Sequence, residues 1–383
     1  MDPRTLDLFF AAIRYELTGQ AIDPSLADGL SEASIGSLIE LSQTHDLSHI
    51  VYRSLSACGL WPKEDAHTAA MERTVHMAQY RYLLMESTLG ALRSALTAAA
   101  IDFVPLKGSV LRHLYPHPYL RVSCDIDLLV RPTDIDRACD VLLHTLGFER
   151  RGASSHDISF FTAENVHVEL HFSLVETANP QPSDAVLSRI FDFAFGESCE
   201  KQLTPEAFYL YHVAHMAKHV MDGGCGVRPF LDMYVLRSVS RDASVCEALL
   251  SEASLTTFAD VCERLTDVWL QGAAHDDATR SLAAYLLSGG VYGTLENSVR
   301  LSKVRRGGRL RFLLSKMFLP YRVLARDYPV LRRHPYLFPL MQVVRWFRLV
   351  FSKDKKRVLD TVRHSRTTEA DETLAEQIRR WGL

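Results

Sequence analysis

Acidic residues recur between positions 125 and 169 at spacings that suit a divalent metal ion. Asp125 and Asp127 stand two apart in a stretch that alternates acidic and apolar residues, as a half-buried strand must. Residues two apart on a strand project from one face, so the two carboxylates would stand side by side. They repel each other unless a cation lies between them, and Mg²⁺ prefers such oxygen ligands and shares them with phosphates. The pair therefore predicts a magnesium site, which Mn²⁺ could also fill.

A third acid on a neighbouring strand would complete the site. Glu169 lies within His167-Val168-Glu169-Leu170-His171, whose alternation places Glu169 and His171 on one face. Two ions held by three carboxylates could activate an attacking oxygen and stabilise a leaving pyrophosphate. If the strand boundaries differ by a few residues, Glu164 or Glu176 would be the third ligand instead.

A candidate phosphate-binding turn lies upstream of the acidic pair. Lys107, Gly108 and Ser109 close an expected strand and open an expected helix, where backbone amides and a helix amino terminus bind phosphate. Gly108 permits close approach, while Lys107 and Arg121 add positive charge for triphosphate oxygens. A lone arginine in a loop is by default a surface residue, and that reading of Arg121 stays open.

These motifs resemble a known superfamily. Residues 104 to 130, with Leu106-Lys107-Gly108-Ser109 and Asp125-Ile126-Asp127, look like the nucleotidyltransferase superfamily related to DNA polymerase beta. The Leu-Lys-Gly start, the arginine four residues before Asp125, the Val-Glu-Leu-His segment and a later His-x-x-x-His helix are similar to a bacterial branch labelled uncharacterised nucleotidyltransferase. The resemblance covers about residues 100 to 240 well and the flanks loosely.

The resemblance implies roles for the residues that match the motifs: the phosphate-binding turn for Gly108 and Ser109, and metal ligands for Asp125, Asp127 and Glu169. One departure concerns the nucleotide. Lys107 occupies a position where many members of the superfamily have glycine. This difference bears on how the triphosphate is held and leaves the nucleotide preference open.

A later helix and the segment after it carry further candidates. His212, His215 and His219 recur at spacings of three and four, so they line one helical stripe. The stripe could bind zinc, face the active cleft, or consist of ordinary core and surface histidines; no His-Glu-x-x-His pattern is present. By resemblance, three residues look like second-domain contacts to nucleotide or acceptor, against the alternative of ordinary interhelical ion pairs: Lys218, Arg228 and Asp232.

The elements that must position these residues indicate an α+β fold. Residues 4 to 98 have helical spacing of apolar residues and end in one long helix from about 62 to 99. A small mixed sheet follows, with helices packed on it and a helix from 134 to 146 that stops at Gly147. Its expected strands are 103–106, 124–130, 148–150, 158–162 and 167–172. Beyond Pro205 the chain is helical again.

Four segments are expected from this order. They are a helical region (1–99), a nucleotidyltransferase core (100–200), a helical domain that completes the cleft (201–296) and a basic, mainly helical region (297–383). Residues 297 to 366 contain 19 Lys and Arg against three acids. Such a block attracts nucleic acid or an anionic membrane, but a packed core with a basic outer face has the same composition; we favour the packed core.

The composition limits location and class. The chain has 383 residues, a net charge of -3 and seven widely spaced cysteines, which suggest neither a disulfide framework nor a zinc ribbon. No window of 18 apolar residues and no secretory signal pattern is present, so we expect no transmembrane segment and a cytoplasmic location.

We therefore expect a metal-dependent enzyme that transfers a nucleoside monophosphate from a nucleoside triphosphate to an acceptor hydroxyl. The acceptor could be a small molecule, a natural product, a peptide or protein, or RNA. Two alternatives stay open: a catalytically silent nucleotide-binding module, against which the intact acids argue, and a metal hydrolase that uses the histidine stripe.

Overall fold

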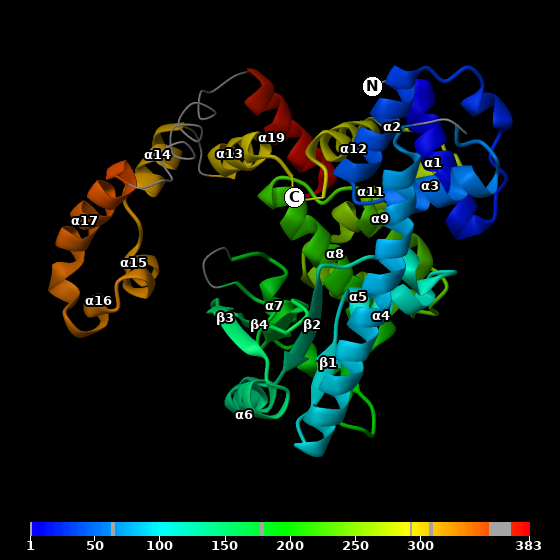
Figure 1. Ribbon diagram of the computed structural model, residues 1–383. Coiled ribbons are helices and arrows are strands. Elements are labelled where there is room, and N and C mark those ends of the chain that lie inside the picture. Colours follow the sequence, from blue (N-terminus) through cyan, green and yellow to red (C-terminus); the bar gives the residue numbers. More distant parts are fainter. Residues whose placement is uncertain (1, 63–65, 177–179, 292, 306–308, 352–368) are drawn as a thin grey trace. The chain divides into compact units, whose positions relative to one another are not determined.

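The computed structural model describes the chain except for residues 1, 63–65, 177–179, 292, 306–308 and 352–368 (Figure 1). Its contacts divide it into two units. One unit contains residues 1–216 and 227–279, and the other contains 217–226 and 280–383. Helix α8 (Pro205–Asp222) begins in the first unit and ends in the second.

Four helices open the first unit: α1 (Pro3–Thr18), α2 (Glu32–Thr44), α3 (Ser48–Ala57) and α4 (Thr68–Ala98). Asp2 and Ser31 cap α1 and α2 with their side chains, which accept hydrogen bonds from backbone amides of the first turn. The long helix was expected from about residue 62, but α4 begins at Thr68. A proline near a first turn marks a helix start only when the following residues continue the helix.

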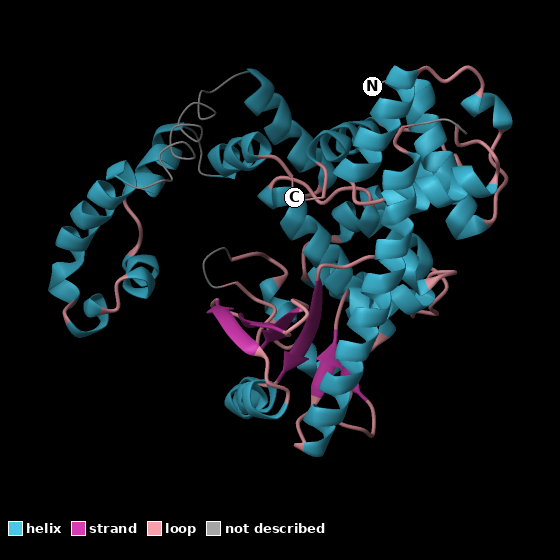
Figure 2. Ribbon diagram, viewed as in Figure 1, coloured by secondary structure: helices cyan, strands magenta, loops and turns pink. Residues whose placement is uncertain are grey.

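The sheet has five strands in the order β1-β2-β5-β4-β3 (Figure 2). Their bounds are β1 (Phe103–Pro105), β2 (Asp125–Val130), β3 (Glu149–Ala153), β4 (Asp157–Phe161) and β5 (His167–His171). Strands β2 and β5 are parallel, and the other neighbours are antiparallel. The expected small mixed sheet flanked by helices is therefore confirmed.

One face of the sheet is apolar and buried. It presents Ile126, Leu128, Val168 and Leu170, all at most 1% exposed, to the second half of α4 and to α6 (Ile135–Asp140). Each such side chain contributes roughly 1.5 to 3 kcal/mol to stability. Since alternate residues project from opposite faces, burial of this set fixes the acids of β2 and β5 on the other face.

The helices after the sheet follow the expected order. The predicted helix from 134 to 146 consists of α6 and a wider turn at Val141–Thr145, and it ends at Gly147 with a φ of 69°. Helix α8 ends at a glycine-rich segment, in which Gly223, Gly224 and Gly226 have positive φ. The first unit also contains the short helices α5 (Gly108–Leu111) and α7 (Asp184–Leu187) and the later helices α9 (Arg228–Leu236), α10 (Ala243–Glu252) and α11 (Thr256–Gln271).

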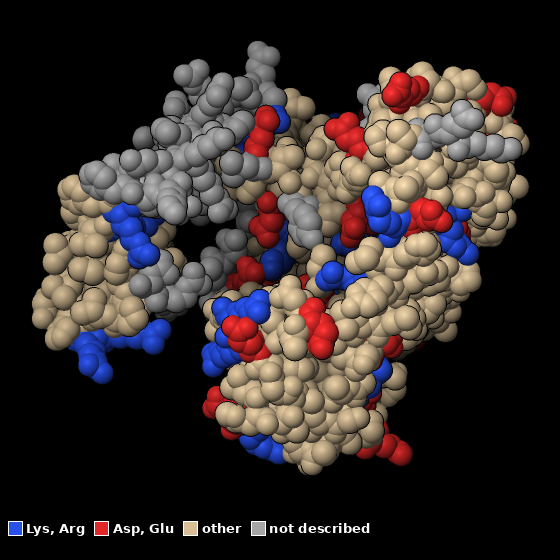
Figure 3. Space-filling model, viewed as in Figure 1, with Lys and Arg blue, Asp and Glu red and all other residues tan. Residues whose placement is uncertain are grey.

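The second unit is helical and basic. Its helices include α12 (Asp277–Gly289), whose first turn still belongs to the first unit, α13 (Leu295–Arg305), α14 (Arg309–Met317), α15 (Tyr321–Asp327), α16 (Val330–Arg333), α17 (Phe338–Phe351) and α19 (Glu369–Trp381). In Figure 3 the surface over α15 to α17 is largely uncharged, with basic side chains at its edges. Part of the expected basic block, residues 352–368, lies outside the described residues. No described helix is long and apolar enough to cross a membrane.

Candidate active site

Register within the sheet brings the predicted carboxylates together. On β2 and β5, Asp125 pairs with His167, and Asp127 pairs with Glu169. Paired residues of adjacent strands project from the same face, so the acids of both strands share the polar face of the sheet. The alternation in the sequence predicted the face, and the register adds that Asp127 and Glu169 lie directly opposite each other.

The side chains form two overlapping clusters that could hold metal ions. One contains Asp125, His167 and Glu169, and the other contains Asp127, Glu169 and His171; within each, the ligand atoms lie within 4.8 Å of one another. His171 Nε2 lies 2.9 Å from Asp127 Oδ1 and 3.3 Å from Glu169 Oε2. Glu169 belongs to both clusters, so it could bridge two ions.

The two alternative third acids lie elsewhere. Glu164 lies between β4 and β5, on the wall of a pocket, and Glu176 Oε1 lies 3.7 Å from His156 Nε2. Among the described residues, neither shares a metal-capable cluster with Asp125 or Asp127. Glu169 is therefore the third acid that the geometry favours.

Lys107 closes the site from the end of β1. Its Nζ lies 2.7 Å from Asp127 Oδ1. Burial alone would lower the pKa of Lys107, but Asp127, Tyr211 and Asp125 outweigh burial and raise it. The backbone of Lys107 has a φ of 45°, a value that residues other than glycine rarely adopt. The chain therefore keeps a lysine here at a backbone cost, and its ammonium group faces the carboxylates.

Burial and charge shift the pKa values of the site residues in different directions. Burial would raise the pKa of Asp127, but Lys107 and His171 outweigh it and lower the pKa well below the usual value. Burial and the charge of Asp127 raise the pKa of Asp125. Burial would lower the pKa of His171, but hydrogen bonds to Asp127 and Glu169 raise it to about 9. Without metal, Lys107 and His171 thus offset part of the negative charge of the three carboxylates.

The turn after Lys107 is tightly packed. A Cβ on Gly108 would lie 3.0 Å from both Cβ and Oγ of Ser123, a tight contact that would require Ser123 to shift. The amide of Ser109 donates to Leu106 O at 3.1 Å and serves the turn itself. Ser109 Oγ, however, is buried without a hydrogen-bond partner. Its hydroxyl is thus the unsatisfied polar group at the predicted phosphate-binding turn.

Arg121 and Asp232 form a buried ion pair. Arg121 Nε lies 2.7 Å from Asp232 Oδ1, and Tyr115 donates its hydroxyl to the same oxygen at 2.7 Å. Arg121 also donates to the carbonyl of Val122. These contacts are internal to the protein, so the structure gives Arg121 and Asp232 a structural role. Binding of nucleotide or acceptor by either residue stays a prediction.

Arginines hold the segment that leads into β2. Arg228 Nη1 lies 3.0 Å from Asp46 Oδ2 and donates to Val122 O at 2.9 Å. Arg81 of α4 donates to the next two carbonyls, those of residues 123 and 124, at 2.7 and 2.9 Å. Arg81 was not predicted from the sequence, because nothing in a helix sequence shows which distant carbonyls a guanidinium will reach. Together these contacts fix the backbone just before Asp125.

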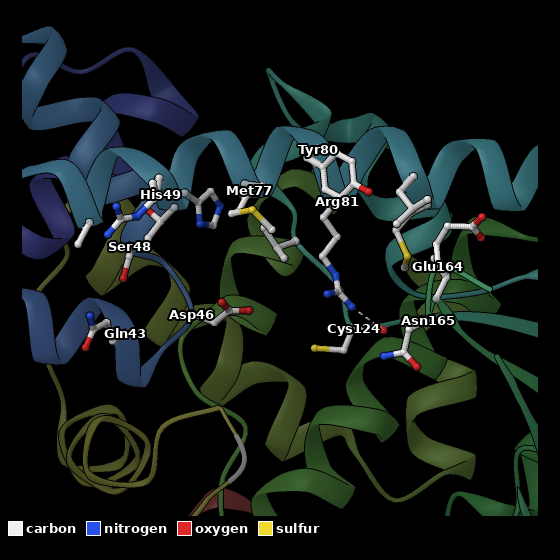
Figure 4. Close-up of a pocket in the computed structure, with 18 residues that line it drawn as sticks. Gln43, Asp46, Ser48, His49, Met77, Tyr80, Arg81, Cys124, Glu164 and Asn165 are labelled. Atoms are coloured by element: carbon white, nitrogen blue, oxygen red, sulfur yellow. Dashed lines mark hydrogen bonds between the residues drawn. The ribbon is translucent and has the colours of Figure 1, made fainter. Parts of the chain in front are cut away.

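A pocket opens beside this segment (Figure 4). It has a volume of about 670 Å³, and Arg81 reaches across it to the carbonyl of Cys124. Its wall combines apolar, acidic and basic side chains, including Asp46, Arg73, Met77, Tyr80, Arg81, Val122, Cys124, Glu164 and Asn165. Cys124 directly precedes Asp125 in the chain, but the lining of the pocket contains none of the three acids, so the pocket is separate from the candidate metal site.

Tyr211 is a buried site residue that sequence reasoning missed. It lies on α8 and is 5% exposed. Burial raises its pKa; Lys107 opposes the rise, while Asp127, Asp125 and Glu169 add to it. An aromatic residue at helical spacing is usually an ordinary core residue, and only the folded structure shows that this phenol lies near the acids.

The histidine stripe of α8 is divided. His212 is buried, its Nε2 lies 2.9 Å from Pro229 O, and burial lowers its pKa, so it has a structural role. The ring of His215 lies 6.1 Å from that of Tyr211. Lys218 and His219 belong to the second unit, and their roles stay predictions. No metal-capable cluster among the described residues includes a histidine of this stripe.

A mixed sheet that gathers three carboxylates beside a glycine turn has the architecture of a nucleotidyltransferase. A family model described as "Uncharacterised nucleotidyltransferase" matches residues 31–269, well over half of the chain, and the chain belongs to this family. The expected resemblance is thereby confirmed. No curated protein and no solved structure matches the chain.

Proposed function

We propose that the protein is a metal-dependent enzyme that transfers a nucleoside monophosphate to an acceptor hydroxyl. The acceptor oxygen forms a bond to the α-phosphorus of a nucleoside triphosphate. The bond from that phosphorus to the bridging oxygen breaks, pyrophosphate leaves, and the hydroxyl proton passes to the site or to solvent. The observation that carries this proposal is the convergence of Asp125, Asp127 and Glu169 on one face of the sheet.

The donor set fits divalent cations. Asp125, Asp127 and Glu169 would hold the ions. The buried Nε2 of His167, which lies 3.9 Å from Glu169 Oε1 and has no hydrogen-bond partner among the described residues, is in the same cluster as Asp125 and Glu169. Mg²⁺ or Mn²⁺ would neutralise phosphate charge when bound. Carboxylates suit both ions, whereas an imidazole nitrogen is a better ligand for Mn²⁺ than for Mg²⁺.

Residues around the acids would bind and position the substrates. Lys107 and Ser109 lie at the turn after β1, and we assign them to the triphosphate. We do not assign the pocket beside Cys124 to the acceptor, because none of the three acids lines it. The acceptor stays open among peptide, RNA and small molecules.

Transfer of label tests the proposal. The purified protein is incubated with Mg²⁺ or Mn²⁺ and each nucleoside triphosphate, labelled at the α or the γ phosphate, together with cell extract treated with RNase or protease. We expect label from the α position on an acceptor with wild type, and none with Asp127→Asn or Glu169→Gln. Label from the γ position would indicate a kinase. Binding of nucleotide without any transfer would indicate a silent module.

A further inference from the structure

A second group of metal-capable side chains adjoins the proposed active site. His171, at the end of β5, pairs with Asp157 of β4, and His156 precedes Asp157. Each of the three offers a ligand atom, and these atoms lie within 4.8 Å of one another. Glu176 Oε1 lies 3.7 Å from His156 Nε2. The group combines two imidazoles with two carboxylates, and three of its four members are absent from the nucleotidyl-transfer proposal.

One ring nitrogen of His171 has no hydrogen-bond partner among the described residues. Its Nε2 contacts Asp127 and Glu169, whereas Nδ1 is buried and has no hydrogen-bond partner. The whole residue is only 5% exposed. A buried polar atom without a partner is costly. Metal-bound histidines typically donate the N–H of the other ring nitrogen to a carboxylate, and His171 has its Nε2 beside two carboxylates.

We infer that His171 Nδ1, His156 and Asp157 bind a transition-metal dication such as Zn²⁺, with Glu176 placed to complete the coordination. Two imidazole nitrogens and a carboxylate suit zinc, whereas magnesium is usually held by oxygen ligands alone. Ser154 orients the ligands: its Oγ lies 3.1 Å from His156 Nδ1 and donates to Asp157.

This second site would act on the first through one imidazole ring. A metal on Nδ1 requires that His171 keep its proton on Nε2, where it donates to Asp127. The metal would thereby fix the orientation of the His171 ring beside Asp127 and Glu169. The inferred site binds its metal whether or not nucleotidyl transfer is the reaction.

Metal titration tests the zinc site. Metal-free full-length protein is titrated with Zn²⁺ by calorimetry in excess Mg²⁺. We expect one tight site whose affinity falls about 100-fold or more in His156→Ala, because a lost ligand costs at least as much as a lost supporting group. Asp125→Asn and the surface control His113→Ala should bind like wild type. Unchanged affinity in His156→Ala, or loss of tight binding in Asp125→Asn, would overturn the inference.

A second readout guards against unfolding of a variant. With Co²⁺ in place of Zn²⁺, wild type should give the visible absorption of cobalt bound by nitrogen and oxygen ligands, and Asp157→Asn should reduce or shift it. Thermal unfolding of each variant confirms that it is folded. A cobalt spectrum that is identical in wild type, His156→Ala and Asp157→Asn would show that the metal lies elsewhere.

A different feature, on α17, carries a second inference. One face of this helix packs in the second unit, where Gln342 donates to Leu319 O and Trp346 donates to Met317 O. The opposite face is apolar and exposed, with spacings of three and four residues. It consists of Leu340 (53% exposed), Val343 (39%), Val344 (40%) and Phe347 (62%). The expected packed core with a basic outer face therefore does not describe this helix.

The surroundings of this apolar face are strongly basic. Residues 309 to 348 contain nine Lys and Arg and one acid, Asp327. Basic side chains edge the uncharged surface over α15 to α17 (Figure 3). We propose that this face docks onto an anionic membrane surface, with the apolar residues at the boundary of the acyl chains and the basic residues near the phosphates. Nucleic acid fits less well, because Leu340, Val343 and Val344 cannot stack on bases.

Sedimentation with vesicles tests this proposal. We expect the full-length protein to bind vesicles that contain phosphatidylglycerol, to bind phosphatidylcholine vesicles at least about tenfold more weakly, and to dissociate in high salt. Val344→Glu should lose binding, whereas Val245→Glu, which alters an exposed valine of α10, should not. Vesicle binding by Val344→Glu that equals that of wild type would overturn the proposal. So would the absence of vesicle binding together with a dimer or an RNA complex that forms in wild type and is lost in Val344→Glu.

Discussion

Asp125 and Asp127 stand two residues apart on β2, yet their pKa values shift in opposite directions. The difference arises from their neighbours: Lys107 and His171 contact Asp127, whereas burial and the charge of Asp127 itself act on Asp125. Neighbouring carboxylates whose pKa values are shifted in opposite directions are common in catalytic sites. In the metal-free site, the charge of Asp127 is therefore compensated by Lys107 and His171, whereas the charged form of Asp125 is disfavoured by burial and by the charge of Asp127.

Replacement of Asp125 by asparagine should therefore stabilise the metal-free protein while it abolishes transfer. Removal of the repelling charge should raise the melting temperature by roughly 2 °C, and loss of a metal ligand should lower kcat/KM by more than about 100-fold. Differential scanning calorimetry in EDTA and the label-transfer assay measure the two effects. Asp127→Asn is the matched control and should lower the melting temperature, because it leaves Lys107 without its partner.

Two substitutions of Lys107 can distinguish the effect of its backbone strain on stability from the effect of its charge. Lys107→Met should remove the counter-charge of buried Asp127 and destabilise the protein by roughly 2 to 3 kcal/mol. Lys107→Gly loses the same charge but relieves the positive φ, which is worth about 1 kcal/mol. Urea unfolding should therefore rank the variants as wild type, Lys107→Gly and Lys107→Met. A glycine variant no more stable than the methionine variant would show that the backbone at this position is unstrained.

At the scale of elements, the alternation of acidic and apolar residues predicted which face of β2 carries the acids. It could do so because burial of Ile126 and Leu128 on one face leaves the other for Asp125 and Asp127. The contacts of Arg81 could not be predicted in this way. They join α4 to carbonyls 42 and 43 residues away, and local spacing contains no information about such pairs. The start of α4 was placed too early because a proline is only a weak boundary signal.

Substitution of Arg81 tests whether α4 positions the segment that leads into β2. Its guanidinium donates to the carbonyls of residues 123 and 124, and a lysine cannot make both contacts with the same geometry. Arg81→Lys should lower kcat/KM by about tenfold and weaken binding of Mn²⁺, which electron paramagnetic resonance measures, with little change in melting temperature. Arg73→Lys, on the same helix and the same pocket wall, is the matched control. Equal effects of both substitutions would contradict a positioning role for Arg81.

At the scale of the whole molecule, charge is distributed unevenly along a chain whose net charge is only -3. The acids of the proposed metal site lie in the first unit, and the basic block lies in the second. Composition predicted this segregation. It could not predict whether the apolar residues of the basic block are buried, because burial depends on which helices pack together, and α17 leaves one apolar face exposed.

The first unit also contains two buried histidines that join distant segments. Nε2 of His49 lies 3.0 Å from Leu120 O, and Nε2 of His212 lies 2.9 Å from Pro229 O, so each ring is a neutral donor to a carbonyl. Burial lowers the pKa of both below the ordinary value of 6.5. As the pH falls below 6.5, the unfolded chain therefore takes up protons that the folded chain does not bind, and the free energy of unfolding falls.

The predicted loss is up to about 1.4 kcal/mol per pH unit for each histidine, and it begins just below pH 6.5. Urea unfolding between pH 7.5 and 5.5 measures it. The double variant His49→Gln, His212→Gln keeps an amide donor at each position but cannot titrate, so its stability should fall less steeply across this range. Because every other titrating group is shared, the difference between the two curves isolates the two histidines. Parallel curves would mean that both rings are protonated in the folded chain as readily as in the unfolded one.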